Sequence, residues 1–221
     1  MLEVLDRINL PPRTYSKPVR ASISEYCPKQ QGALIGDCVA VKVEAGVIKE
    51  KEELVLMPQN VIVQVKGMEA QNQKTSRALA GTIVELGIKL PTEFDVSTIK
   101  KGNVLCDPSY PMKLIKSFIA RIIIYDILSP IAKGEAVVVH SHTTKAPGKI
   151  AFLLATIDQS TGETIKSRPK FLRKGQFANV QIKLEERMCL ELFNNYKNLG
   201  RIAIRRENHT IAAGTIIEFV S

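Results

Sequence analysis

Short runs in which apolar and polar residues alternate follow one another along most of the chain. Between residues 19 and 24, for example, Val19, Ala21 and Ile23 alternate with polar side chains. A period of two residues predicts a β-strand with one buried face. Similar runs occupy the rest of the first half, at residues 33–46, 52–58, 60–68, 82–90 and 103–108.

The second half repeats this pattern, and its first run, SFIARIIIYDI (117–127), is unusually apolar. The runs that follow are at residues 135–142, 148–158, 177–184, 188–193, 200–205 and 210–220. Short strands about 8–12 residues apart, with turn residues between them, are typical of a β-barrel or sandwich. We therefore predict an all-β protein with two consecutive barrels, at residues 17–109 and 110–221. Pro108 and Pro111 mark the expected hinge between them.

The first residues differ from this pattern. Leu2, Leu5 and Ile8 are spaced three residues apart, which places them on one face of a helix. Pro11 and Pro12 stop this helix and begin an extended linker. No capping residue precedes the helix, so we expect the natural protein to continue upstream. Residues 1–16 are accordingly assigned to the end of an upstream domain and its linker.

Positive charge is concentrated in the second half of the chain. The whole chain contains 31 Lys and Arg residues against 22 Asp and Glu, a net charge of +9. Residues 1–109 contain 14 basic and 13 acidic residues, whereas residues 110–221 contain 17 and 9. A strongly basic unit beside a nearly neutral one favours an acidic partner for the second, above all nucleic acid. A basic surface that serves solubility is the alternative.

The sequence lacks the motifs of nucleotide chemistry. Its closest approach to a phosphate-binding loop, GALIGD (32–37), has neither the lysine nor the hydroxyl residue that hold phosphate and magnesium. It also falls within an expected strand, and no N-K-x-D motif is present to bind guanine. We therefore expect no cofactor and no catalytic residue in this chain.

Other candidate chemistry is weak. His140 and His142 would share one face of a strand, but no Cys, Asp or Glu near them in sequence completes a zinc site. His209 lies in an expected turn, and no metal ligand is assigned. The four cysteines show no C-x-x-C pair and are interpreted as buried free thiols in a reducing cytoplasm. No segment is apolar enough to cross a membrane, and no signal peptide is recognised.

Two segments are candidate binding surfaces. The first, KSRPKFLRKGQ (166–176), concentrates basic side chains around Phe171 and could neutralise several RNA phosphates. Its basic residues are Lys166, Arg168, Lys170, Arg173 and Lys174. The alternative is a solvated loop with Phe171 and Leu172 packed inward, the orientation that a lone aromatic beside a leucine favours over base stacking.

The second segment is GRIAIR, residues 200–205. Its alternation places Ile202 and Ile204 on the buried face of a strand and Arg201, Ala203 and Arg205 on the other. The planar arginine fork binds carboxylates and phosphates alike. A polar outer face without a partner fits the pattern equally well.

Several segments, taken in order, resemble the second and third domains of translational GTPases of the elongation factor 1-alpha class. They are KPVRASISE, VKVEAGVIKEKEELVLMP, AGTIVELGIK, IKKGNVLCDP, RPKFLRKGQ and LGRIAIRRENHTIAAG, and they span residues from about 17 to 220. In addition, LEVLDRINLPPR resembles the end of the last GTPase-domain helix and its linker. The resemblance implies that GTP and magnesium bind to a GTPase domain upstream, and that the barrels dock on that domain.

Within this class, the segments KPVR, EAG, KFLRKGQ and TIAAG are more similar to the ribosome-rescue factor that pairs with Pelota. SRPKF and MCLELF are also compatible with eukaryotic release factor 3. Elongation factor 1-alpha itself usually has Thr-Gly in place of Ala45-Gly46 and lacks a counterpart of Cys106-Asp107-Pro108. The rescue factor is favoured, with the release factor as the alternative.

In release factor 3, the segment that matches residues 200–205 reads G-R-F-T-L-R and helps to dock release factor 1. Gly200, Arg201 and Arg205 match it, whereas Ile202 replaces the aromatic residue and Ala203 the threonine. The resemblance thus implies a partner-binding segment made of Gly200, Arg201, Ile202, Ala203, Ile204 and Arg205, with Pelota or release factor 1 as the partner. Ribosomal RNA is the expected second partner, and a free-standing RNA-binding β protein is the alternative of another class.

Overall fold

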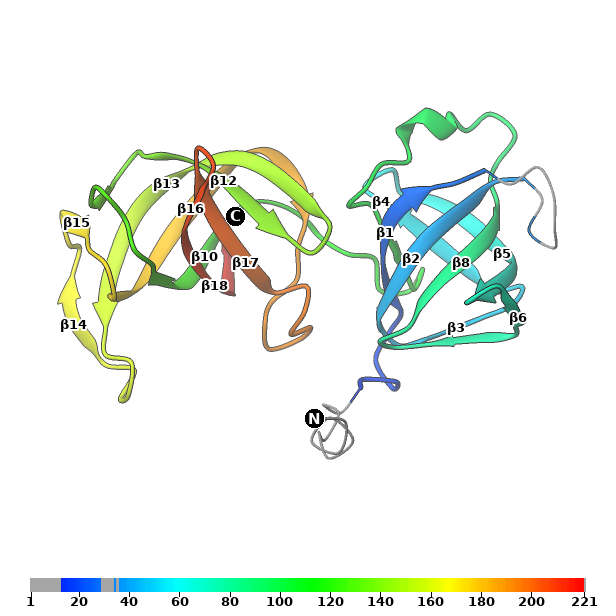
Figure 1. The fold of residues 1–221 in the computed structure, drawn as a ribbon, viewed down its shortest axis with the longest axis horizontal. Helices are drawn as coiled ribbons and strands as arrows, with labels where there is room; N and C mark the ends of the chain where they lie inside the picture. Colours follow the sequence, from blue (N-terminus) through cyan, green and yellow to red (C-terminus); the bar gives the residue numbers. More distant parts are fainter. Residues whose placement is uncertain (1–12, 29–33, 35, 221) are drawn as a thin grey trace, which may run out of the picture.

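A computed structural model describes residues 13–28, 34 and 36–220, which form two antiparallel β-barrels side by side (Figure 1). The all-β prediction and the prediction of two consecutive barrels are therefore confirmed. The helix expected at residues 2–8 lies outside the described residues. The described helical structure is a single turn of 3-10 helix, η1 (Val96–Thr98), and none of the described helices is long and apolar enough to span a bilayer.

The first barrel contains six strands that close into a ring among the described residues. Its ring strands are β1 (Arg20–Tyr26), β2 (Cys38–Ala45), β4 (Glu53–Met57), β5 (Val61–Ala70), β8 (Ile83–Lys89) and β9 (Val104–Cys106). They pair in the order β4-β9-β1-β2-β8-β5, and pairing of β4 with β5 closes the ring. A short strand, β6 (Gln73–Thr75), extends β5, while β3 (Val47–Lys49) and β7 (Arg77–Leu79) form a separate ribbon.

The second barrel repeats this closure with longer strands. Its ring strands are β10 (Leu114–Ile124), β12 (Ala136–Ser141), β13 (Thr144–Ile157), β16 (Phe177–Cys189), β17 (Arg201–Arg206) and β18 (His209–Val220). The order is β12-β17-β18-β10-β16-β13, and pairing of β12 with β13 closes the ring. The short strand β14 (Thr164–Ser167) extends β13, and β11 (Ile131–Ala132) pairs with β15 (Phe171–Leu172) outside the ring.

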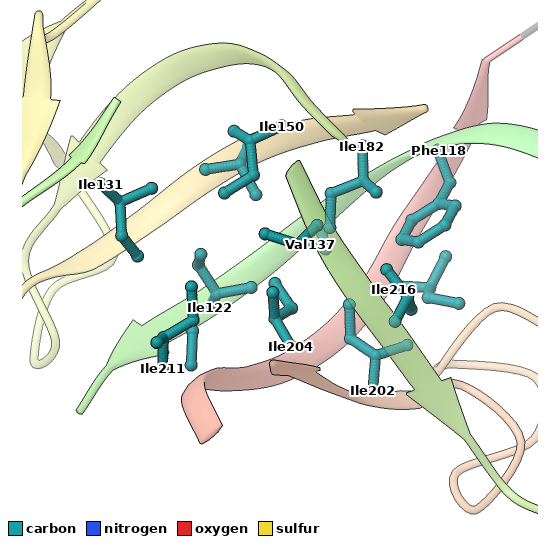
Figure 2. Close-up of a cluster of buried hydrophobic side chains, with 14 of the residues drawn as sticks. Phe118, Ile122, Ile131, Val137, Ile150, Ile182, Ile202, Ile204, Ile211 and Ile216 are labelled. Carbon is teal, nitrogen blue, oxygen red and sulfur yellow. The ribbon is translucent and has the colours of Figure 1, made fainter. Parts of the chain in front are cut away.

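Each barrel has its own apolar core, built from the inward residues of its strands. In the second barrel, Phe118, Ile122, Ile182, Ile204 and others converge from different strands toward the axis (Figure 2). The alternation seen in the sequence creates this arrangement, because successive side chains on a strand point to opposite faces. The sequence therefore determines which face of each long strand is buried.

The expected strands agree with the observed ring strands apart from their ends, with two exceptions. The run at residues 188–193 is not a separate strand, because Met188 and Cys189 end β16 and the chain then leaves the barrel and forms a loop over its end. The segment around Gly36 was expected inside a strand, but β2 begins only at Cys38. Six short strands (β3, β6, β7, β11, β14 and β15) were not predicted, since runs of two to four residues show no readable period.

A third apolar cluster lies between the barrels. It joins Val55, Met57, Val104 and Cys106 on the outside of the first barrel to Cys189 and Leu199 of the second. Met112, in the segment that connects the barrels, is also part of it. These first-barrel residues alternate with core residues, so β4 and β9 are buried on both faces. The two barrels therefore share a packed interface as well as a linker.

Arg20 is the polar centre of this interface. Alternation predicted that it would face solvent, but its exposed fraction is only 4% because the second barrel covers the outer face of β1. Its Nε donates to Oε1 of Glu191 at 2.9 Å, Nη1 donates to the carbonyl of Val19, and the guanidinium stacks on the ring of Tyr196. Burial raises the pKa of the Tyr196 hydroxyl, which keeps the tyrosine neutral beside this cation. The barrels are thus joined by a buried charge pair.

Gly214 permits the close approach of two ring strands in the second barrel. It lies opposite Ile122 in the β10–β18 pairing. A Cβ at this position would lie 2.0 Å from the carbonyl oxygen of Arg121 and 2.8 Å from the Cα of Ile122. Because these are backbone atoms, a larger residue would push the two strands apart.

We expect Gly214→Ala to lower the free energy of unfolding by about 1–3 kcal/mol, because the added methyl overpacks the β10–β18 contact. Urea denaturation followed by circular dichroism measures this change. Thr215→Ala, at the next position of β18, adds no atoms and serves as the control. Equal denaturation midpoints for Gly214→Ala and the unmodified chain would contradict this account of the strand contact.

We expect Arg20→Ala to destabilise the chain by roughly 3 kcal/mol, because Glu191, whose side chain is only 12% exposed, is left with an unpaired charge at the interface. Scanning calorimetry should also resolve two transitions where the unmodified chain shows one, since the barrels lose their shared contact. The double variant Arg20→Ala/Glu191→Ala should recover part of the loss. A single transition at an unchanged temperature would show that the apolar cluster alone joins the barrels.

Candidate partner-binding surface

Strand β17 carries the predicted partner-binding residues, and its two faces differ in burial. Ile202 and Ile204 are 4% and 0% exposed and point into the core of the second barrel (Figure 2). Arg201 is exposed on the outer face, and Ala203 and Arg205 are half-buried there. The predicted division into a core face and an outer face is therefore confirmed, and only the outer face can contact a partner directly.

Gly200 has a structural role at the start of β17. The loop that follows Leu190 folds over it so closely that a Cβ at residue 200 would lie 2.4 Å from the backbone nitrogen and Cα of Phe193. The amide of Gly200 donates to the carbonyl of Tyr196, and its own carbonyl accepts from Ile216. Gly200 is buried, so it positions the loop and the strand and offers no surface of its own.

Arg201 is the most available cation of the strand. Its guanidinium lies 5.8 Å from the centroid of the Phe193 ring, a cation–π contact that orients the side chain. Within the described part of the chain, this guanidinium forms no hydrogen bond and no ion pair. Its donors are therefore free for an acceptor on another molecule. Its backbone is held on one side by the pairing of Arg201 with Thr215 of β18, and on the other by the Ser141 hydroxyl of β12, which donates to the carbonyl of Arg201 at 3.1 Å.

The next two arginines are occupied within the barrel. Arg205 donates through Nη2 to the carbonyl of Asn208, and its buried Nε has no partner among the described residues. Arg206 forms an ion pair with Glu135 at 2.5 Å and donates to the carbonyl of Ser129. Arg205 can contribute positive charge to the surface, whereas the charge of Arg206 is neutralised locally.

The histidines do not share a strand face as expected. His140 lies on β12 beside Ala203 of β17, but His142 lies beyond the strand with a positive φ of 38°, which ends the alternation. Nε2 of His142 donates to the carbonyl of Cys189 at 3.2 Å in the tautomer that protonates it. Neither histidine belongs to a group of three or more possible metal ligands in the described ranges.

The basic segment at residues 166–174 lies at the far end of the second barrel, across β14 and β15. Its five predicted RNA-binding residues are all exposed; they are Lys166, Arg168, Lys170, Arg173 and Lys174. Lys174 forms an ion pair with Asp126 at 2.7 Å. The others have no ion pair within the described residues. The segment is therefore a second basic surface, separate from β17.

Phe171 does not pack inward, contrary to the expectation. Its side chain is 45% exposed, whereas its neighbour Leu172 is fully buried. The two residues form β15, so alternation directs only one of them to the core, and the aliphatic residue takes that place. The guanidinium of Arg173 lies 4.9 Å from the Phe171 ring centroid. An aromatic face and cations therefore lie together on this surface.

Residues 117–217 match the family described as the GTP-eEF1A C-terminal domain-like family. Elongation factor 1-alpha of Pyrobaculum arsenaticum is 34% identical over 218 residues, which cover 99% of this chain and 48% of that protein. Protein HBS1 of Drosophila melanogaster is 29% identical over 216 residues, which cover 98% of this chain and 31% of that protein.

Among solved structures, sup35 complexed with GMPPNP superimposes with a TM-score of 0.85 and 26% identity, covering 100% of this chain and 52% of that one. The chain thus spans about half the length of the elongation factor 1-alpha relative and of the sup35 structure. The fold, the domain match and these relatives agree, so the chain contains the C-terminal domain of the elongation factor 1-alpha class of translational GTPases and is similar along its length to the C-terminal part of these proteins.

Proposed function

We propose that this chain is the partner- and ribosome-binding part of a cytoplasmic translational GTPase that delivers Pelota to stalled ribosomes. The observation that carries the proposal is the exposed and unbonded guanidinium of Arg201 on a strand held rigid on both sides. A preorganised arginine loses little conformational entropy on binding, so it suits a specific contact with a carboxylate. GTP and magnesium would bind to the GTPase domain upstream, against which the barrels would dock.

The resemblance of KPVR, EAG, KFLRKGQ and TIAAG to the rescue factor supports Pelota as the partner, and the match to Protein HBS1 fits it. The alternative is release factor 1 in translation termination, which the match to sup35 fits. Ile202, where release factor 3 has an aromatic residue, points into the core and cannot distinguish the partners by contact. Ala203, where release factor 3 has a threonine, lies on the outer face and can distinguish the partners by direct contact.

We also propose that the basic segment at residues 166–174 contacts ribosomal RNA. Four of its cations have no ion pair among the described residues, and Phe171 offers an exposed ring for a base beside Arg173. This segment is distant from β17 on the same barrel (Figure 1). Protein and RNA contacts could therefore be made at the same time.

We expect Arg201→Glu to weaken binding of Pelota by roughly tenfold, because the reversed charge faces a carboxylate of the partner. Isothermal titration calorimetry measures the affinity, with release factor 1 titrated in parallel. Lys183→Glu, an exposed position on β16, applies the same charge change elsewhere and should leave the affinity unchanged. If the unmodified chain binds release factor 1 more tightly than Pelota, the proposed function changes from ribosome rescue to translation termination.

If Arg201→Glu binds both proteins as the unmodified chain does, β17 is not the partner surface. If the unmodified chain binds neither protein but binds RNA tightly, it is the free-standing RNA-binding protein of the third alternative. Each of these results would overturn the proposal for β17.

We expect the double variant Lys170→Glu/Arg173→Glu to reduce RNA affinity and to make it less dependent on salt. Each phosphate contact that is lost lowers the number of counterions released from the RNA on binding. Fluorescence anisotropy with a labelled ribosomal RNA fragment at several salt concentrations measures both quantities. Lys113→Glu/Lys116→Glu carries the same charge change at exposed positions near the other end of the barrel. An equal loss in the two double variants would show that net charge, and not this segment, governs the binding.

A further inference from the structure

A groove lies where the two barrels meet, beside the predicted partner strand. Its volume is about 540 Å³, and it is lined by Lys101 of the first barrel and by the β12–β13 hairpin of the second. The hairpin residues that line it are His140, His142, Thr143, Thr144 and Lys145. The hairpin reaches toward the first barrel in the ribbon view (Figure 1). Both barrels are therefore needed to form the groove.

The walls of the groove are held in place by contacts across the interface. The hydroxyl of Thr143 donates to the carbonyl of Ile23 in β1 at 3.0 Å. Gly102 lies so near the hairpin that a Cβ on it would be 2.4 Å from the Cβ of Thr144. The ring of His142 is fixed by its hydrogen bond to the carbonyl of Cys189. A ligand would therefore meet a preformed site.

The groove is electropositive. Its lining residues are two lysines, two histidines and two threonines, with no Asp or Glu among these described residues. In the part of the chain that the structure describes, neither lysine has an ion pair or a side-chain hydrogen bond. Burial lowers the pKa of His140, and the positive charges of Arg205 and Lys145 lower it further. His140 thus responds to a net positive field around it.

Glu44, an acidic side chain that acts on His142, does not neutralise this field. Glu44 is close enough to raise the pKa of His142, although burial of the ring lowers this pKa by a larger amount. Its carboxylate is already bound to the ammonium of Lys42 at 3.1 Å and to the side-chain amide of Asn198 at 2.9 Å. The lysines of the groove are therefore left without a counter-charge from this residue.

The groove is continuous with the outer face of β17. His140 lies directly opposite Ala203 in the β12–β17 pairing and directly opposite Lys145 in the β12–β13 pairing. Ser141, next to His140, donates its hydroxyl to the carbonyl of Arg201 at 3.1 Å. A molecule that contacts Arg201 and Ala203 would reach Lys145 by crossing one strand, a distance of about 5 Å per strand.

We propose that this groove binds a carboxylate-bearing segment of the same protein partner that contacts β17, with Lys101 and Lys145 as its ion-pair partners. This inference rests on the proposed function and extends it by assigning a role to the first barrel. A protein segment is favoured over RNA because no Phe, Tyr or Trp side chain lines the groove to stack a base. The hydroxyl of Thr144 and the imidazole of His140 supply further hydrogen bonds to the carboxylate or its backbone, whereas the Thr143 hydroxyl, which donates to Ile23, can only accept one.

The test measures Pelota and release factor 1 binding by calorimetry with the variants Lys101→Glu and Lys145→Glu. Each should weaken the complex that forms by roughly tenfold, because a repulsive charge then faces the acidic segment. Lys100→Glu and Lys149→Glu are matched controls, since both lysines are exposed neighbours that do not line the groove. The controls should stay within about twofold of the unmodified chain, as expected for rim charges.

Three additional measurements separate the possible results. The double variant Lys101→Ala/Lys145→Ala should lose affinity by a smaller factor than the product of the factors lost by the two single alanine variants, because one ligand segment contacts both lysines. Thermal unfolding of every variant identifies any that lose affinity through loss of structure, and the alanine variants then decide the result. Binding of fluorescein-labelled oligouridine tests the RNA alternative directly.

If Arg201→Glu weakens the complex but the groove variants behave as their controls do, the groove inference is wrong and the proposed function stands. If the groove variants lose oligouridine binding and retain the protein complex, the groove is an RNA site and the inference is overturned. If the unmodified chain binds neither protein, the proposed function and this inference are both refuted.

Discussion

The buried pairing of Arg20 with Glu191 fixes how the two barrels sit against each other, and the binding surfaces depend on that arrangement. Arg20 is only 4% exposed, so its charge must be paired, and the barrels can separate only by leaving Glu191 or Arg20 without its partner. The ring of Tyr196 and the apolar cluster around Cys106 and Cys189 exclude water from the pair. The charge pair therefore fixes the relative orientation of two surfaces that also share an apolar cluster.

The loop that carries Glu191 connects this interface to the candidate site. Between Leu190 and Leu199, the chain leaves the second barrel, contacts Arg20 through Glu191 and Tyr196, and returns over Gly200. Phe193 of the same loop stacks on Arg201. One loop thus holds the barrels together and also orients the arginine proposed to bind a partner. A displacement of this loop at the interface would also move Phe193 and change the orientation of Arg201, since both contacts belong to a single segment.

The closed barrels explain why a flat strand surface can be specific. β17 has hydrogen-bonded neighbours on both sides, so its exposed side chains are displayed from a fixed backbone and its edges are not free to pair with another chain. Specificity must then come from side chains on the outer face and from the adjoining groove. The basic segment at the other end of the same barrel, with its exposed Phe171, leaves room for a separate RNA contact.

The sequence alone determined the fold class, most of the ring strands and the faces that form the two barrel cores, because alternation is a local property of a long strand. It also identified Arg201 as outward and Ile202 and Ile204 as core residues. It could not reveal that Arg20 is buried, that Phe171 is exposed, that Gly200 supports a loop, or that Lys101 lies near Lys145. Each of these depends on contacts between segments far apart in the chain, and a barrel surface becomes an interface or a groove only when another barrel lies against it.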